Sequence, residues 1–89
     1  MHAATWPRMT TTAPLLRGGG ELHVVRSDDV VTFEDPDGAM HRLVELADGS
    51  RSTQELHRVL ASEYPRVRHD DVVDAVARLE AAGLVESAG

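Results

Sequence analysis

The chain has 89 residues and a formal net charge of −6, and its nine basic residues are all arginine. This length allows one small domain, and without cysteines neither a disulfide nor a cysteine-based zinc site can support its core. No apolar run approaches the roughly 20 residues that a membrane span needs, and no secretory signal pattern opens the chain. These properties predict a single cytoplasmic domain without a membrane partner, either a discrete protein or part of a larger one.

The first half of the chain predicts a tail followed by three short strands. Residues 1–13 are polar and threonine-rich without periodicity, so we expect a flexible tail in which Trp6 is a stray aromatic residue. Strand patterns follow at Pro14–Arg17, Glu21–Arg26 and Val30–Glu34, with three glycines at the first reversal. The third strand, VVTFE, is rich in β-branched and aromatic residues and would form the edge of an antiparallel meander.

From Ala39 onward the apolar residues recur every three or four positions, which predicts amphipathic helices. The first helix should end at Gly49, and the second should begin with a capping box formed by Ser52 and Glu55 and end at Pro65. The core residues predicted for these two helices are Met40, Leu43, Val44, Ala47, Leu56, Val59, Leu60 and Tyr64.

A third helix should begin at His69 or Asp70, and Gly83 with Leu84 predicts a Schellman-type end followed by a short extended tail or wing. The predicted fold is therefore α+β. It consists of a three-stranded antiparallel meander followed by three helices, similar to a winged helix-turn-helix, over residues 14–87. The core residues predicted for the third helix are Val72, Val76 and Leu79.

No motif specific for catalysis or metal binding is present. The five histidines do not share the spacing that metal ligands on one helix need. Asp35, Asp37, Asp70 and Asp71 fall at turns and helix starts, which explain them without a catalytic role. The glycine run precedes neither a helix nor a lysine, so no phosphate-binding loop is predicted. We therefore expect a domain that is not an enzyme and that uses neither a cofactor nor a metal.

The third predicted helix, residues 70–82, distinguishes two binding functions. In a winged-helix DNA-binding protein this helix would enter the major groove and offer basic and amide side chains to the DNA. It carries four carboxylates and one arginine, a net charge of −3, which a phosphate backbone repels. DNA binding is therefore the alternative prediction, together with a general protein-interaction or dimerisation domain.

The same helix fits one wall of a peptide-binding groove better. An open edge strand at Val30–Glu34 can accept a partner strand, whose main chain supplies affinity and whose alternate side chains supply specificity. The small and apolar residues Val73, Ala77 and Val76 of the helix would form the second wall, unless Val73 and Ala77 only complete the core. Glu34 and Glu80 would lie at the rim. The predicted peptide-binding residues are Val30, Val31, Thr32, Phe33, Glu34, Val72, Val73, Val76, Ala77 and Glu80.

Two segments, LVELADGSRSTQELHRVLASEY and VVDAVARLEAAGLVE, resemble the PqqD-like precursor-peptide recognition elements of ribosomal natural-product pathways. With the order of three strands and three helices, the resemblance covers roughly Pro14–Ser87. It implies a non-catalytic domain that binds the leader of a precursor peptide as a strand antiparallel to Val30–Glu34, against the third helix. The implied partners are that leader peptide and a modifying enzyme, fused or separate. The open sheet edge would also permit a homodimer.

Overall fold

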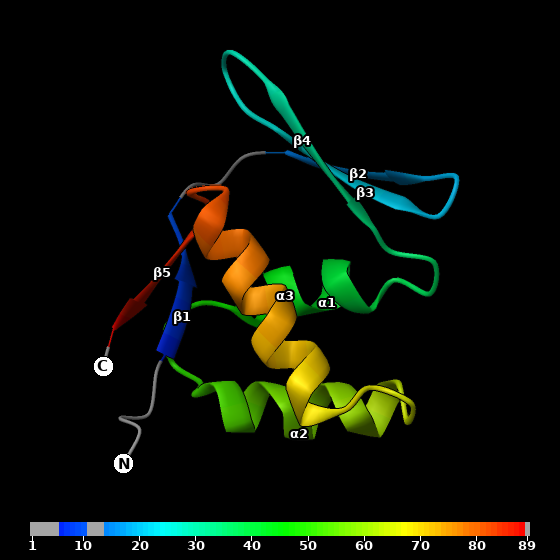
Figure 1. Ribbon diagram of the computed structural model, residues 1–89, viewed down its shortest axis with the longest axis vertical. Coiled ribbons are helices and arrows are strands. Elements are labelled where there is room, and N and C mark those ends of the chain that lie inside the picture. The colour runs from blue at the N-terminus through cyan, green and yellow to red at the C-terminus, as the bar shows by residue number, and fades with distance from the viewer. Residues whose placement is uncertain (1–5, 11–13, 89) are drawn as a thin grey trace.

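The computed structural model describes residues 6–10 and 14–88, which form an α+β fold (Figure 1). A three-stranded antiparallel sheet has the order β2-β3-β4, and three helices follow it in the chain. The predicted meander followed by three helices is therefore confirmed, and a two-stranded sheet is added to it. The elements are β1 (Trp6–Met9), β2 (Leu15–Gly18), β3 (Glu21–Val25), β4 (Val30–Glu34), α1 (Ala39–Leu46), α2 (Thr53–Glu63), α3 (His69–Ala81) and β5 (Val85–Ala88).

The N-terminal strand corrects the expectation of a flexible tail over residues 1–13. β1 pairs antiparallel with β5, so segments from opposite ends of the chain form one ribbon. The N–H of Met9 also donates to the carbonyl of Ala47 at 3.0 Å, which attaches the ribbon to the end of α1. This segment is ordered because its backbone has partners that lie far away in the sequence. The rest of the predicted tail, residues 1–5 and 11–13, lies outside the described residues.

The hydrophobic core lies where the helices meet one face of the three-stranded sheet. In Figure 1 all three helices lie on the same side of this sheet, and α3 runs from α2 towards it. Most of the predicted core residues are buried; Val59 and Tyr64 are half-buried and pack against the others. No helix among residues 6–10 and 14–88 is long and apolar enough to cross a membrane. The core comprises Leu22, Val24, Met40, Leu43, Val44, Leu46, Leu56, Leu60, Val72, Val76, Leu79, Leu84 and Val85.

Two helix ends have the caps that the sequence predicts. Ser52 accepts a hydrogen bond from the N–H of Glu55 at 3.2 Å, and the Glu55 carboxylate accepts one from the N–H of Ser52 at 3.0 Å. After α3, Gly83 has a φ of 75°, and the N–H of Leu84 donates to the carbonyl of Leu79 at 2.9 Å. This Schellman geometry satisfies the last carbonyls of α3 and turns the chain into β5.

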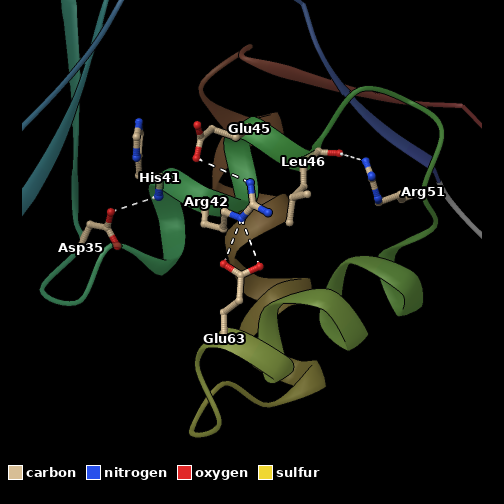
Figure 2. Close-up of polar contacts among 7 residues, drawn as sticks. All are labelled: Asp35, His41, Arg42, Glu45, Leu46, Arg51 and Glu63. Atoms are coloured by element: carbon tan, nitrogen blue, oxygen red, sulfur yellow. Dashed lines mark hydrogen bonds and ion pairs between the residues drawn. The ribbon is translucent and has the colours of Figure 1, made fainter.

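Polar contacts hold α1 between the sheet and α2 (Figure 2). The buried carboxylate of Asp35 accepts a hydrogen bond from the N–H of His41 at 3.0 Å. It also accepts one from the N–H of Met40 at 2.8 Å, so it satisfies two donors at the start of α1. Arg42 donates to Glu63 of α2 at 3.1 Å, and this hydrogen bond raises the pKa of Arg42. These contacts fix the orientation of α1 relative to both the end of β4 and α2.

Candidate functional site

The outer edge of β4 has no partner strand within the part of the chain that the structure describes, since β4 stands last in the sheet order β2-β3-β4. Two hydrogen bonds define the pairing pattern between β3 and β4. The N–H of Arg26 donates to the carbonyl of Asp29, and the N–H of Asp35 donates to the carbonyl of Gly20, each at 2.8 Å. Each bond joins residues that lie opposite each other, since they continue the register of the two strands.

These two bonds determine which backbone groups of β4 face outward. Hydrogen-bonded and non-hydrogen-bonded pairs alternate along an antiparallel ladder. The bonded pairs between the two ends are therefore those of Val31 and Phe33, whose backbone groups point towards β3. The N–H and C=O groups of Val30, Thr32 and Glu34 point to the open edge, where another strand can bind them.

The side chains of β4 also divide into two sets. Val31 and Phe33 are half-buried and lie opposite Val24 and Leu22, which are fully buried, so all four side chains face the helices. The other three β4 side chains point to the opposite, uncovered face of the sheet. An added strand would thus place every second side chain towards α3. The uncovered set consists of Val30, Thr32 and Glu34, all exposed.

A cleft of about 430 Å³ lies where β4 ends, between the β4–α1 connection and the N-terminal half of α3. Most of its lining is apolar, and four of the lining residues belong to the core, although the buried residue Asp35 lines it as well. Three exposed acidic residues and one exposed arginine also border it, so its surroundings are acidic. The apolar lining residues are Pro36, Ala39, Met40, Leu43, Leu60, Val67, Val72 and Ala75. The exposed charged ones are Glu34, Asp37, Arg66 and Asp71.

Arg26 fixes the beginning of β4 relative to α3. Its guanidinium donates to both carboxylate oxygens of Asp29 at 2.6 Å and to the carbonyl of Ala82 at 2.8 Å. The hydrogen bond between the two side chains raises the pKa of Arg26 and lowers the pKa of Asp29. Ala82 ends α3, so the positive charge also lies at the favourable end of the helix dipole.

Arg17 fixes the other end of β4. Its Nε lies 3.5 Å from the carboxylate of Asp35, and its Nη2 donates to the carbonyl of the same residue at 3.2 Å. A Cβ added to Gly38 would lie 3.1 Å from this guanidinium, and Gly38 has a φ of 90°, so the turn into α1 favours glycine. The cleft therefore opens beside a rigidly held turn.

Two histidines contact the connection between α2 and α3, which also lines the cleft through Val67. The rings of His57 and His69 meet edge to face with their centroids 5.7 Å apart. The Nε2 atom of His57 lies 3.1 Å from the carbonyl of Val67, a residue of the cleft lining. No group of three or more histidine, aspartate or glutamate side chains in residues 6–10 and 14–88 is placed to hold a metal ion.

The predicted peptide-binding residues do not all lie beside this edge. The five from β4 do. Val72 and Val76 are 1% and 5% exposed and belong to the core, and of these two Val72 lines the cleft. The three that remain, Val73, Ala77 and Glu80, are exposed on α3 but are not part of the cleft lining.

The surface of α3 that borders the cleft is formed by other residues. Asp71 and Ala75 line the cleft, and the carbonyl of Ala82 is bound to Arg26 at the other end of the helix. At 3.6 residues per turn, Val73 and Ala77 project about half a turn away from these positions. Val73 and Ala77 are exposed on another face of α3 and do not line the cleft, so a helix wall formed by these two residues stays a prediction. Asp71 and the small residue Ala75, beside the core stripe, are the lining positions of α3 that the predicted site omitted.

Comparison of the chain with protein-family models, with curated proteins and with solved structures found no match. The features that a partner would meet are the open edge of β4, the apolar cleft at its end and the acidic surroundings of that cleft.

Proposed function

We propose that this domain binds the leader segment of a ribosomally synthesised precursor peptide and delivers it to a modifying enzyme, without catalysing a reaction itself. The leader would add to the open edge of β4 as an antiparallel strand and continue over the cleft beside α3. The observation that carries this proposal is the position of the open backbone groups of Val30, Thr32 and Glu34 on an edge that ends at an apolar cleft. Strand addition of this kind is a common mode of peptide recognition.

The edge of β4 lacks the features that usually protect an exposed strand. Natural sheets block their edges with proline, lysine, bulges or a covering segment. β4 contains neither proline nor lysine, and it pairs with β3 residue for residue without a bulge. The opposite edge, β2, is shorter and carries Arg17 and Gly18, and none of its residues belongs to the cleft lining. Of the two edges, β4 is therefore the better template for a peptide.

The nature of the peptide rests on the resemblance of residues 14–87 to precursor-peptide recognition elements. The charges of α3 agree with a peptide rather than a nucleic acid. Its carboxylates are all exposed, and a phosphate backbone along this surface would be repelled. These carboxylates are Asp70, Asp71, Asp74 and Glu80.

The test is fluorescence polarisation with labelled leader peptides encoded by the short reading frames next to the gene. We expect one of them to bind with a Kd of about 1 µM or less, in the range of stable peptide complexes. A labelled DNA duplex, measured at several salt concentrations, is the comparison. Strand addition predicts a weak salt dependence, whereas phosphate contacts predict a steep one. Failure of every neighbouring short peptide to bind would overturn the proposal.

The variant Thr32→Pro makes the test specific for the edge. Because the N–H of Thr32 points outward, proline at this position removes a donor for the peptide and leaves the bonds to β3 intact. Thr32→Val is the matched control, since both variants lose the 3.0 Å hydrogen bond between the Thr32 hydroxyl and His23. We expect Thr32→Pro to lose peptide binding while it stays folded by circular dichroism, and Thr32→Val to bind like the unaltered domain.

A further inference from the structure

The register of β4 restricts the sequence of a bound peptide, if the proposed strand addition holds. In an added strand, side chains opposite Val31 and Phe33 would share the face that points to α3, and those opposite Thr32 and Glu34 would share the uncovered face. The first set would bury against half-buried apolar residues, which favours apolar side chains. The second set would remain in contact with solvent.

The cleft adds a third inward position. Asp35 follows β4 in the same alternation, and Glu34, Asp35 and Pro36 all belong to the cleft lining. A peptide residue opposite Asp35 would therefore point into the apolar cleft. In an antiparallel strand this residue precedes those opposite Phe33 and Val31 in the peptide. The peptide should therefore carry apolar residues at the three alternate positions opposite Asp35, Phe33 and Val31. The first of these residues would occupy the cleft.

The outward position next to Glu34 has an unusual electrostatic environment. Glu34 lies directly opposite Glu21 on the neighbouring strand, and both side chains are exposed on the uncovered face. Like charges at directly opposed positions destabilise a sheet. Glu34 has no ion pair or side-chain hydrogen bond within the described part of the chain, and Glu21 lies 3.9 Å from His23. An added strand would place one side chain beside Glu34, on the side away from Glu21.

We infer that the site selects a peptide with the pattern apolar, basic, apolar, any residue, apolar, read from its N-terminal end. The first apolar side chain enters the cleft, and the arginine or lysine that follows it pairs with Glu34. The basic residue offsets the repulsion between Glu21 and Glu34, of which only Glu21 has a neighbouring basic side chain in the described part of the chain.

Three labelled synthetic peptides test this pattern by fluorescence polarisation. One has the core Ile-Arg-Val-Thr-Val between glycine–serine flanks, the second has glutamate in place of arginine, and the third has the same composition with the alternation shifted by one position. We expect the arginine peptide to bind roughly threefold to twentyfold tighter than the glutamate peptide at low salt, as cross-strand charge pairs allow. The difference should shrink as salt is added, and the shifted peptide should bind more weakly than the first.

A charge reversal at Glu34 assigns the preference to this residue. Glu34→Arg should invert the order of the arginine and glutamate peptides. Glu80→Arg makes the same charge change on α3, outside the cleft lining, and should leave the order of the two peptides unchanged. Equal binding of the two peptides, or the same order in Glu34→Arg, would overturn the pattern.

The outcome of this test is separable from that of strand addition. If the peptides bind equally well and Thr32→Pro abolishes their binding, strand addition stands and the charge pattern falls. If a natural leader binds and none of the designed peptides does, the pattern also falls. If neither the leaders nor the designed peptides bind, both proposals fail.

Discussion

Arg26 donates a hydrogen bond to the carbonyl of Ala82 at 2.8 Å, so a side chain from the β3–β4 connection is bound to the end of α3. The same guanidinium binds both carboxylate oxygens of Asp29 immediately before β4. The distance between the open edge and α3 therefore depends on one planar group with several donors.

Arg26→Lys should weaken peptide binding severalfold. An ammonium group keeps the charge but cannot reproduce the planar, two-pronged contact with Asp29 together with the bond to Ala82. Arg58→Lys, on the exposed face of α2, is the matched control and should have no effect. Polarisation titrations with the leader peptide compare the two variants. Equal affinity of Arg26→Lys and Arg58→Lys would show that this contact does not position the edge.

Asp35→Ala should destabilise the domain by about 2 kcal/mol, because it leaves two N–H groups at the start of α1 without an acceptor and removes the carboxylate that lies 3.5 Å from Arg17. Asp37→Ala removes one exposed acceptor for the N–H of Ala39 and should cost less than about 1 kcal/mol. Urea unfolding curves of both variants measure the difference. Similar midpoints for the two would contradict the role given to the buried carboxylate.

Ala75→Leu should reduce leader binding at least about tenfold, because the larger side chain fills part of the cleft that a peptide residue would occupy. Ala77→Leu makes the same substitution two residues later on an exposed face of α3 and should leave binding unchanged. Leucine and alanine are both good helix formers, so neither variant should unfold α3. If Ala77→Leu reduced leader binding more than Ala75→Leu, the peptide would instead bind on the side of α3 that carries Val73 and Ala77.

The capping box of α2 should give the stability a dependence on pH. The hydrogen bond from the backbone N–H of Ser52, followed by that from its hydroxyl, lowers the pKa of Glu55 below its ordinary value of 4.5. The folded-state pKa is thus the lower one, so the contribution is complete above 4.5 and is lost as the pH falls through the folded-state pKa.

Two variants check this contribution. Ser52→Ala should cost about 1 kcal/mol at neutral pH. Glu55→Gln should reduce the loss of stability between about pH 5 and pH 3, measured by urea unfolding. An unchanged pH profile in Glu55→Gln would mean that the capping carboxylate does not contribute to it.

Much of the fold follows from local sequence patterns. The two-residue alternation in VVTFE and the three-to-four-residue spacing after Ala39 are local properties, and each gave the correct type of element. The caps at Ser52 and Gly83 depend on neighbouring residues alone, and both form as expected.

β1 could not be predicted in the same way. Its sequence, WPRM, has no clear alternation, and Pro7 lacks an N–H for a ladder. What makes it a strand is its pairing with β5, nearly the whole chain length away, and the burial of Pro7. Local sequence patterns cannot predict a pairing with a strand that lies so far away in the chain.

The face of α3 that lies beside the sheet was also beyond sequence analysis. The core stripe at Val72, Val76 and Leu79 has one flank at Val73 and Ala77 and another at Ala75 and Ala82. Periodicity defines the stripe but does not say on which flank a strand packs. The more apolar flank, with Val73 and Ala77, was expected to face the strand, and it is the flank with Ala75 that borders the cleft.

Amide hydrogen exchange, followed by NMR with and without the leader peptide, tests strand addition most directly. In the free domain the N–H groups of Val31 and Phe33 should be protected by β3, and those of Val30, Thr32 and Glu34 should exchange rapidly. We predict that a saturating leader peptide slows exchange at Val30, Thr32 and Glu34. Binding that leaves these three amides unprotected would contradict strand addition at β4.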